Sequence, residues 1–206
     1  MSQSPPIKAV LFDCDGVVRR WDAQDDPTLE RDAGLSAAAV RRIAFLPELL
    51  TPAITGRTSD EAWRRAVAER LAAEFPAADA ELAVARWSAP AGEVDAAALE
   101  LVRACRRRVP VALVTNATSR LPRDLAALGL DREFDQIVNS SAVGACKPDP
   151  ALFHAALAQI GVAAAEALFV DDTPGHVAAA ERLGLRGHVF AGSDGLRSAL
   201  AGLGLI

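Results

Sequence analysis

The chain has 206 residues, of which 51% are hydrophobic and 24% charged, and its formal net charge is −5 at pH 7. These values are typical of one globular domain, or of one domain that carries a substantial insertion. The acidic balance excludes a generally basic nucleic-acid-binding protein, and no apolar run approaches the ~20 residues of a membrane span. The three cysteines are widely spaced and odd in number, which favours a reducing compartment over a disulfide framework. The first eight residues lack the features of a signal peptide, so we expect a soluble, cytoplasmic protein.

Short apolar segments that end in polar residues predict the strands of a parallel sheet. They lie at residues 8–13, 111–115, 134–139, 167–171 and 187–190. Helical segments are expected at 95–108, 121–128, 151–160 and 176–183, and glycines at 129, 161 and 184 mark the ends of the last three. Strands that alternate with helices in this way predict an α/β fold, a Rossmann-like parallel sheet with helices on both faces.

Residues 21–90 interrupt this alternation and contain no convincing strand. Helices are expected at 36–46, 60–75 and 79–87, separated by prolines at 47, 52, 76 and 90. Thr58 to Glu61 fits a capping box that starts the second of these helices. We therefore expect an α/β core domain, residues 1–20 and 91–206, that carries an inserted all-helical cap domain, residues 21–90.

Polar residues gather where the predicted strands end, which is where parallel α/β sheets bind ligands. The set comprises Asp13, Asp15, Thr115, Asn116, Asp171, Asp172 and, in the loop after the third strand, Lys147. Four carboxylates at one site repel one another unless a divalent cation lies among them, and oxygen ligands suit magnesium. The pattern therefore predicts a Mg²⁺ site at this edge of the sheet.

Lys147 is unusual in its residue type. Only 2 of the 22 basic residues are lysine, Lys8 and Lys147. A lysine in so arginine-rich a chain indicates a position that needs a compact ammonium rather than a planar guanidinium.

Two other kinds of acidic site fit less well. Asp13 to Gly16 could begin a calcium loop, but the glycine comes two places early and Gln24 stands where the loop needs Glu. A receiver-like phosphorylation module also gathers acids, a threonine and a lysine at strand ends. It would place its phosphorylated aspartate after the middle strand and would have no helical insertion after the first.

Four ordered motifs resemble those of the haloacid dehalogenase superfamily of aspartate-nucleophile hydrolases. They are D-C-D-G-V-V at 13–18, V-T-N at 114–116, K-P-D-P at 147–150 and F-V-D-D-T at 169–173. The insertion occupies the place of the family's helical cap, and G-R-T-S-D-E-A-W at 56–63 resembles its short-capped (C1-type) members. Those members include sugar-phosphate phosphatases and the phosphatase half of bifunctional epoxide hydrolases.

The resemblance implies a role for each motif residue. Asp13 would attack phosphorus and form an aspartyl-phosphate, and Asp15 would act as general acid and then as general base. Asp13, Asp172 and the backbone carbonyl of Asp15 would hold magnesium, with Asp171 acting mainly through bound water. Thr115 would hold the phosphoryl oxygens together with neighbouring backbone N–H groups and Asn116, and Lys147 would neutralise charge on them.

Asp15 favours phosphoryl chemistry, because the dehalogenases of this family attack carbon and lack an acid two residues after the nucleophile. We therefore expect a magnesium-dependent phosphatase for a small phosphorylated metabolite, such as a sugar phosphate. A phosphomutase or phosphotransferase and a non-catalytic phosphate-binding regulator stay open as alternatives. Arg57 or the Arg19–Arg20 pair is expected to reach the leaving group, and His176 is a weaker candidate for contact with the site. The sequence sets no oligomeric state.

Overall fold

The computed structural model describes residues 5–21, 32–35 and 38–206. Its centre is a parallel sheet of β1 (Ala9–Phe12), β4 (Val111–Thr115), β5 (Gln136–Asn139), β6 (Ala167–Asp171) and β7 (Arg186–Val189). The spatial order is β5-β4-β1-β6-β7, so β1 lies in the middle, with Leu11 opposite Ala112 on one side and Phe169 on the other. The predicted Rossmann-like α/β fold is confirmed.

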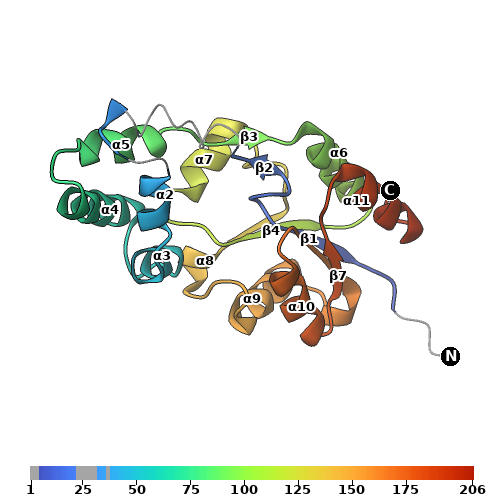
Figure 1. The fold of residues 1–206 in the computed structure, drawn as a ribbon. Coiled ribbons are helices and arrows are strands. Elements are labelled where there is room, and N and C mark those ends of the chain that lie inside the picture. The colour runs from blue at the N-terminus through green and yellow to red at the C-terminus, as the bar shows by residue number, and fades with distance from the viewer. Residues whose placement is uncertain (1–4, 22–31, 36–37) are drawn as a thin grey trace.

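Alternate residues of the strands pack on opposite faces of the sheet. Val10 and Phe12 belong to one hydrophobic cluster, and Ala9 and Leu11 belong to another. The first cluster includes α6 (Ala96–Arg106), α7 (Leu121–Leu128) and α11 (Ser193–Gly202), and the second includes α9 (Pro150–Ile160) and α10 (Pro174–Arg182). Figure 1 shows these two sets of helices on either side of the strands. Helix α11 and the short helix α8 (Ser140–Val143) were not predicted from the sequence.

Helices α2 (Ala39–Ala44), α3 (Pro47–Ile54), α4 (Asp60–Glu74) and α5 (Ala80–Trp87) form a separate group at one end of the molecule (Figure 1). They enclose a hydrophobic cluster of their own, in which the rings of Trp63 and Trp87 meet edge to face, 5.9 Å apart. This separate cluster supports the proposed division of the chain into a core and an inserted cap. No helix of the described residues is long and apolar enough to cross a bilayer.

Two local predictions in the inserted helices were wrong. Pro47 and Pro52 were expected to separate helices, but Pro47 is the first residue of α3 and Pro52 lies inside it. A proline at the first position needs no hydrogen bond, because the N–H that it lacks would have had no partner in the helix. Helix α4 begins at Asp60, as predicted, but its N-cap is Ser59 rather than Thr58, the first residue of the predicted capping box, and Oγ of Ser59 accepts a hydrogen bond from the N–H of Ala62 at 3.2 Å. Residues 36–37, the start of the helix predicted at 36–46, lie outside the described residues.

The chain enters and leaves the inserted helices through a short antiparallel ribbon that the sequence did not predict. Its strands are β2 (Arg19–Arg20) and β3 (Glu93–Val94), with Arg19 opposite Val94. Because β2 follows Asp13 by only a few residues, the ribbon places both connections between the sheet domain and the inserted helices next to the carboxyl end of β1.

The aromatic contact between α9 and the sheet gives a test of the core. The rings of Phe153 and Phe169 are fully buried and meet edge to face at 5.2 Å. We expect Phe153→Ala to lower the free energy of unfolding by about 3–5 kcal/mol, as measured by urea denaturation followed by circular dichroism. The matched control is Phe45→Ala, since Phe45 is 53% exposed and its removal should change stability by only about 0.5 kcal/mol. Similar losses in the two variants would contradict this account of the core.

Candidate active site

The predicted site residues meet at the carboxyl ends of β1, β4 and β6. Asp13 follows β1, Thr115 ends β4, and Asp171 ends β6, and all three are buried. The structure brings Asp13, Asp15, Thr115, Asn116, Lys147 and Asp172 to the wall of one cavity of about 620 Å³. Asp171 lies directly behind this wall and contacts Lys147.

The ammonium group of Lys147 joins two carboxylates of neighbouring strands. Its Nζ lies 2.8 Å from Oδ1 of Asp13 and 2.7 Å from Oδ2 of Asp171. Only 3% of Lys147 is exposed, so these charges interact with little screening by water. A compact ammonium fits between two carboxylates at these distances, as the choice of lysine at this position indicated.

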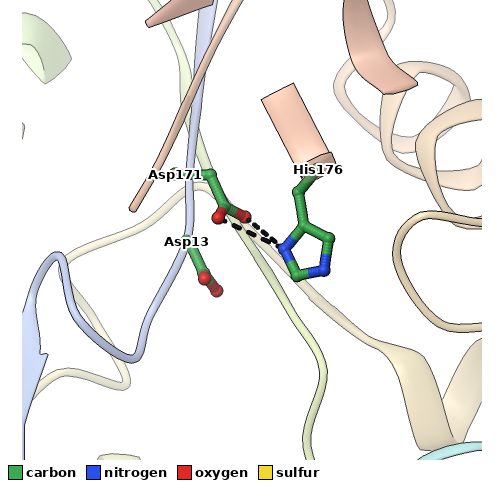
Figure 2. A group of neighbouring side chains, drawn as sticks. All are labelled: Asp13, Asp171 and His176. Atoms are coloured by element: carbon green, nitrogen blue, oxygen red, sulfur yellow. Dashed lines mark hydrogen bonds and ion pairs between the residues drawn. The ribbon is translucent and has the colours of Figure 1, made fainter. Parts of the chain in front are cut away.

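Asp171 is held on every side by hydrogen-bond donors. Besides Lys147, it accepts a hydrogen bond from the N–H of Thr173 at 2.8 Å, and Nδ1 of His176 lies 3.2 Å from both of its oxygens. Figure 2 shows His176 facing this carboxylate, with Asp13 on the other side. Burial alone would raise the pKa of Asp171, but His176 and Lys147 together lower it to about 2. Asp171 is therefore a fixed anion that positions Lys147, and His176, a weaker candidate from sequence, contacts Asp171 and also lines the cavity.

Asp13 presents one free oxygen to the cavity. Its Oδ1 accepts a hydrogen bond from the N–H of Cys14 at 2.7 Å and is ion-paired with Lys147, whereas Oδ2 accepts no hydrogen bond from the described residues. Burial raises the pKa of Asp13 to about 7, against the lowering effect of Lys147. A divalent cation beside this carboxylate would favour its charged form.

The side chain of Asp15 is turned toward two donors. Arg19 binds it through Nε at 2.6 Å and through a terminal nitrogen at 3.0 Å, and Nε1 of Trp21 donates at 2.8 Å. Arg19 is only 3% exposed, and its NH1 also lies 3.7 Å from Asp124. Burial alone would lower the pKa of the Arg19 guanidinium, but the hydrogen bonds from it to Asp15 raise the pKa above its usual range.

The prediction about the arginines needs correction. Arg19 does reach the cavity, but its guanidinium is taken by Asp15. Arg57 and Arg20 are exposed and do not line the cavity. Arg57 donates to Thr55 at 3.1 Å, and Arg20 pairs with Asp95 at 3.7 Å. Another arginine of the cavity lining, Arg120, joins the inserted helices to the sheet domain.

Asn116 has a different set of contacts from those expected of a phosphate ligand. Its Nδ2 donates to the backbone carbonyl of Lys147 at 2.9 Å, and its Oδ1 accepts from the backbone N–H of Lys147 at 2.7 Å. This pair of hydrogen bonds joins the loop after β4 to the loop that carries Lys147. Asn116 therefore positions the ammonium group, and Thr115, at the end of β4, keeps the place expected for contact with phosphoryl oxygens.

The loops also join the inserted helices to the sheet. Asp60, at the start of α4, accepts a hydrogen bond from the hydroxyl of Thr118 at 2.8 Å, and its N–H donates to Oγ of Ser119 at 3.0 Å. Arg120 donates to the backbone carbonyls of Ser88 and Pro90 and pairs with Asp124 at 2.8 Å. Sequence reasoning missed these residues, and their only signal is the i, i+4 spacing of Arg120 and Asp124.

The donor set beside Gly16 fits a magnesium ion. A Cβ on Gly16 would lie 2.0 Å from Oδ2 of Asp172, so this carboxylate is packed directly against the loop that carries Asp13 and Asp15. The Asp172 and Asp13 carboxylates then supply hard oxygen donors, which magnesium prefers. A second group, Asp13, Asp171 and His176, has its ligand atoms within 4.8 Å of one another. It suits a cation less well, because Lys147 already pairs with both carboxylates.

Comparison with known proteins identifies the family. A family model described as haloacid dehalogenase-like hydrolase matches residues 7–184. The chain belongs to the haloacid dehalogenase-like hydrolases. A phosphatase from Mycobacterium tuberculosis is 30% identical over 97% of this chain and 96% of its own length.

Other relatives match in part or in fold. A phosphoserine phosphatase from Thermus thermophilus is 44% identical over 36% of this chain and 30% of its own length, so the chain spans less than half of that relative. A haloacid dehalogenase family enzyme from Bacteroides thetaiotaomicron, solved in complex with magnesium and inorganic phosphate, superposes with a TM-score of 0.70 and 18% identity. That superposition covers 88% of this chain and 93% of the other.

The contact between Gly16 and Asp172 predicts a local effect on metal binding. Gly16→Ala would place a methyl group 2.0 Å from the Asp172 carboxylate and displace it, so we expect magnesium affinity, measured by calorimetry, to fall at least about tenfold. The matched control is Gly144→Ala. Both glycines have positive φ, +82° and +86°, so both variants carry the same backbone strain, but nothing lies within 4 Å of a Cβ at Gly144. An equal loss of affinity in the two variants would mean that Asp172 is not the residue affected.

Proposed function

We propose that this hydrolase is a magnesium-dependent phosphatase that acts on a small phosphorylated metabolite through an aspartyl-phosphate intermediate. The observation that carries the proposal is the asymmetric environment of Asp13. One oxygen is fixed by Lys147 and a backbone N–H, and the other accepts no hydrogen bond from the described residues and belongs to a group that lines the cavity. This is the arrangement that an in-line carboxylate nucleophile needs. The names of the Mycobacterium and Thermus relatives and the magnesium and phosphate bound to the Bacteroides enzyme support the same reaction.

Each residue then has a defined task. Oδ2 of Asp13 forms a bond to phosphorus while the bond from phosphorus to the alcohol oxygen breaks, and water later hydrolyses the acyl phosphate. Lys147 balances the negative charge of the phosphoryl group, and Thr115 contacts its oxygens. Asp13, Asp172 and the backbone carbonyl of Asp15 would hold magnesium, whose chemistry when bound is to neutralise charge on the phosphoryl oxygens.

Asp15 is the proposed acid for the leaving oxygen and the base for water. In the structure both of its oxygens accept hydrogen bonds from Arg19, and Oδ1 also accepts one from Trp21. The side chain must therefore turn away from these donors to carry a proton to the substrate. At 37% exposure it has room to do so at the cavity wall.

The contacts between the inserted helices and the sheet support a small substrate. Asp60 and Arg120 join the inserted helices to the loop after β4 beside the cavity. The inserted helices, which we propose to be a C1-type cap, therefore cover the cavity that Asp13 lines. A covered site excludes water during phosphoryl transfer and admits a metabolite more readily than a phosphoprotein or a nucleic acid.

The decisive experiment measures phosphate release with magnesium and with EDTA, for the wild type and for Asp13→Asn. We expect EDTA to abolish turnover and excess magnesium to restore it. Asp13→Asn should lose at least about 10³-fold in kcat, because it keeps the shape of the side chain and removes the attacking charge. Asp131→Asn, the same change at an exposed position outside the cavity lining, is the control. A folded Asp13→Asn protein with a near wild-type rate would refute the covalent mechanism.

The acid role of Asp15 predicts a dependence on the leaving group. Asp15→Asn should reduce kcat/KM by about 10²–10⁴-fold for benzyl phosphate, whose alkoxide needs a proton. The loss should be much smaller for nitrophenyl phosphate, whose phenolate departs without one. Steady-state kinetics on the two esters makes the comparison, and equal losses would show that Asp15 does not protonate the leaving group.

A further inference from the structure

We infer that the leaving group of the substrate carries an aromatic ring rather than the several hydroxyl groups of a sugar. This inference rests on the proposed phosphatase function and goes beyond it by naming the substrate class. It replaces the expectation of a sugar phosphate, which came from family resemblance alone.

The first observation is the distribution of aromatic residues. The chain has three tryptophans and no tyrosine, and Trp21, Trp63 and Trp87 all line the cavity. They come from three separate parts of the sequence, so their meeting at one cavity is a product of the fold. Tryptophan and phenylalanine side chains favour the binding of other planar rings, through stacked and edge-to-face contacts.

The second observation is the exposed apolar surface within the wall. Phe45 is 53% exposed although it is a large apolar side chain, and Leu50 and Ile54 of α3 are partly exposed beside it in the lining. Trp63 and Trp87 are more than nine-tenths buried and supply only the parts of their rings that reach the surface. An apolar ring placed against this wall would remove apolar surface from water, which favours binding.

The third observation concerns the polar groups of the same wall, which already have partners in the protein. Asp60 pairs with Arg64 at 2.5 Å and accepts from Thr118, and Arg64 also donates to Oγ of Ser88 at 3.2 Å. Arg120 is committed to Asp124 and to backbone carbonyls. Two buried atoms of these lining residues are exceptions, because Nε of Arg64 and Oδ2 of Asp60 have no hydrogen-bond partner among the described residues, although Oδ2 is ion-paired with Arg64.

A sugar would leave most of its hydroxyl groups unpaired against such a wall. Each polar group that loses water without gaining a partner costs about 1–3 kcal/mol. An aromatic alcohol has no such cost, and one buried donor can meet at most one acceptor. The cavity, about 620 Å³, lies within the range of sites for small organic ligands and has room for a phosphoryl group and one or two fused rings.

The test compares benzyl phosphate with glucose 6-phosphate in the presence of magnesium. Both are esters of primary alcohols, so the leaving oxygen has similar chemistry and the comparison isolates recognition of the remainder. We expect kcat/KM to be at least about tenfold higher for benzyl phosphate. Phe45→Ala should reduce this ratio severalfold. Leu82→Ala, which also removes an exposed apolar side chain of the inserted helices but lies outside the cavity lining, should keep the ratio. Equal or higher kcat/KM for glucose 6-phosphate, or an unchanged ratio in Phe45→Ala, would overturn the inference.

A binding measurement separates this inference from the proposed function. Benzylphosphonate cannot be hydrolysed, and calorimetry can compare it with methylphosphonate on the wild type and on both variants. Tighter binding of benzylphosphonate, by about tenfold and dependent on Phe45, supports the aromatic site even if no ester is turned over, in which case only the proposed phosphatase function fails. Equal affinities for the two phosphonates would overturn the aromatic site even if the protein is an active phosphatase.

Discussion

The ammonium group of Lys147 is the interaction on which the site depends. It lies between Asp13 and Asp171, which follow or end the adjacent parallel strands β1 and β6. Two buried carboxylates on neighbouring strands would favour protonation, and burial first, with repulsion from Asp171 adding to it, raises the pKa of Asp13 even with Lys147 in place. The ammonium group allows both carboxylates to stay on the same sheet edge. Asn116, which follows β4, holds the backbone of Lys147. The proposed nucleophile Asp13, its charge partner Lys147 and the anion Asp171 therefore form one unit.

The polar network continues from this floor to the inserted helices. The loop after β4 carries Asn116, which binds the Lys147 backbone, and then Thr118, Ser119 and Arg120, which bind the start of α4 and the segment that leaves α5. A single loop thus positions the ammonium group and holds the cover of the cavity. Since Arg120 also pairs with Asp124, and Asp124 lies near Arg19, the contacts reach the partner of Asp15 as well. Movement of the inserted helices would therefore change the contacts of Asp15, the proposed acid.

The sequence predicted the parts of the site that follow from strand periodicity and motif order. Polar residues at strand ends had to meet at one edge, and Asp13, Lys147 and Asp172 are found there. It could not predict that the Asn116 amide would pair with the backbone of Lys147, because an amide after a strand can bind either a ligand or a neighbouring loop. The proline pattern concealed α3, because Pro47 marks a helix start as readily as a break. Arg19 was noticed, but its partner was not, since the pairing depends on how the β2–β3 ribbon turns the chain.

The cavity has a floor made by the sheet and a wall made by the inserted helices, and these two parts are subject to different constraints. The floor is fixed by charge pairing, so a change to Lys147 deprives two buried carboxylates of the cation that they share. In the wall, Trp63 and Trp87 serve two purposes, because the rings that line the cavity also fill the core of α2–α5. Replacing either one would change substrate contacts and destabilise the inserted helices together. Phe45 is not subject to this coupling, because half of its side chain is exposed. The wall can therefore change its preference at Phe45 at little cost in stability, whereas its aromatic character at the tryptophans is tied to the fold.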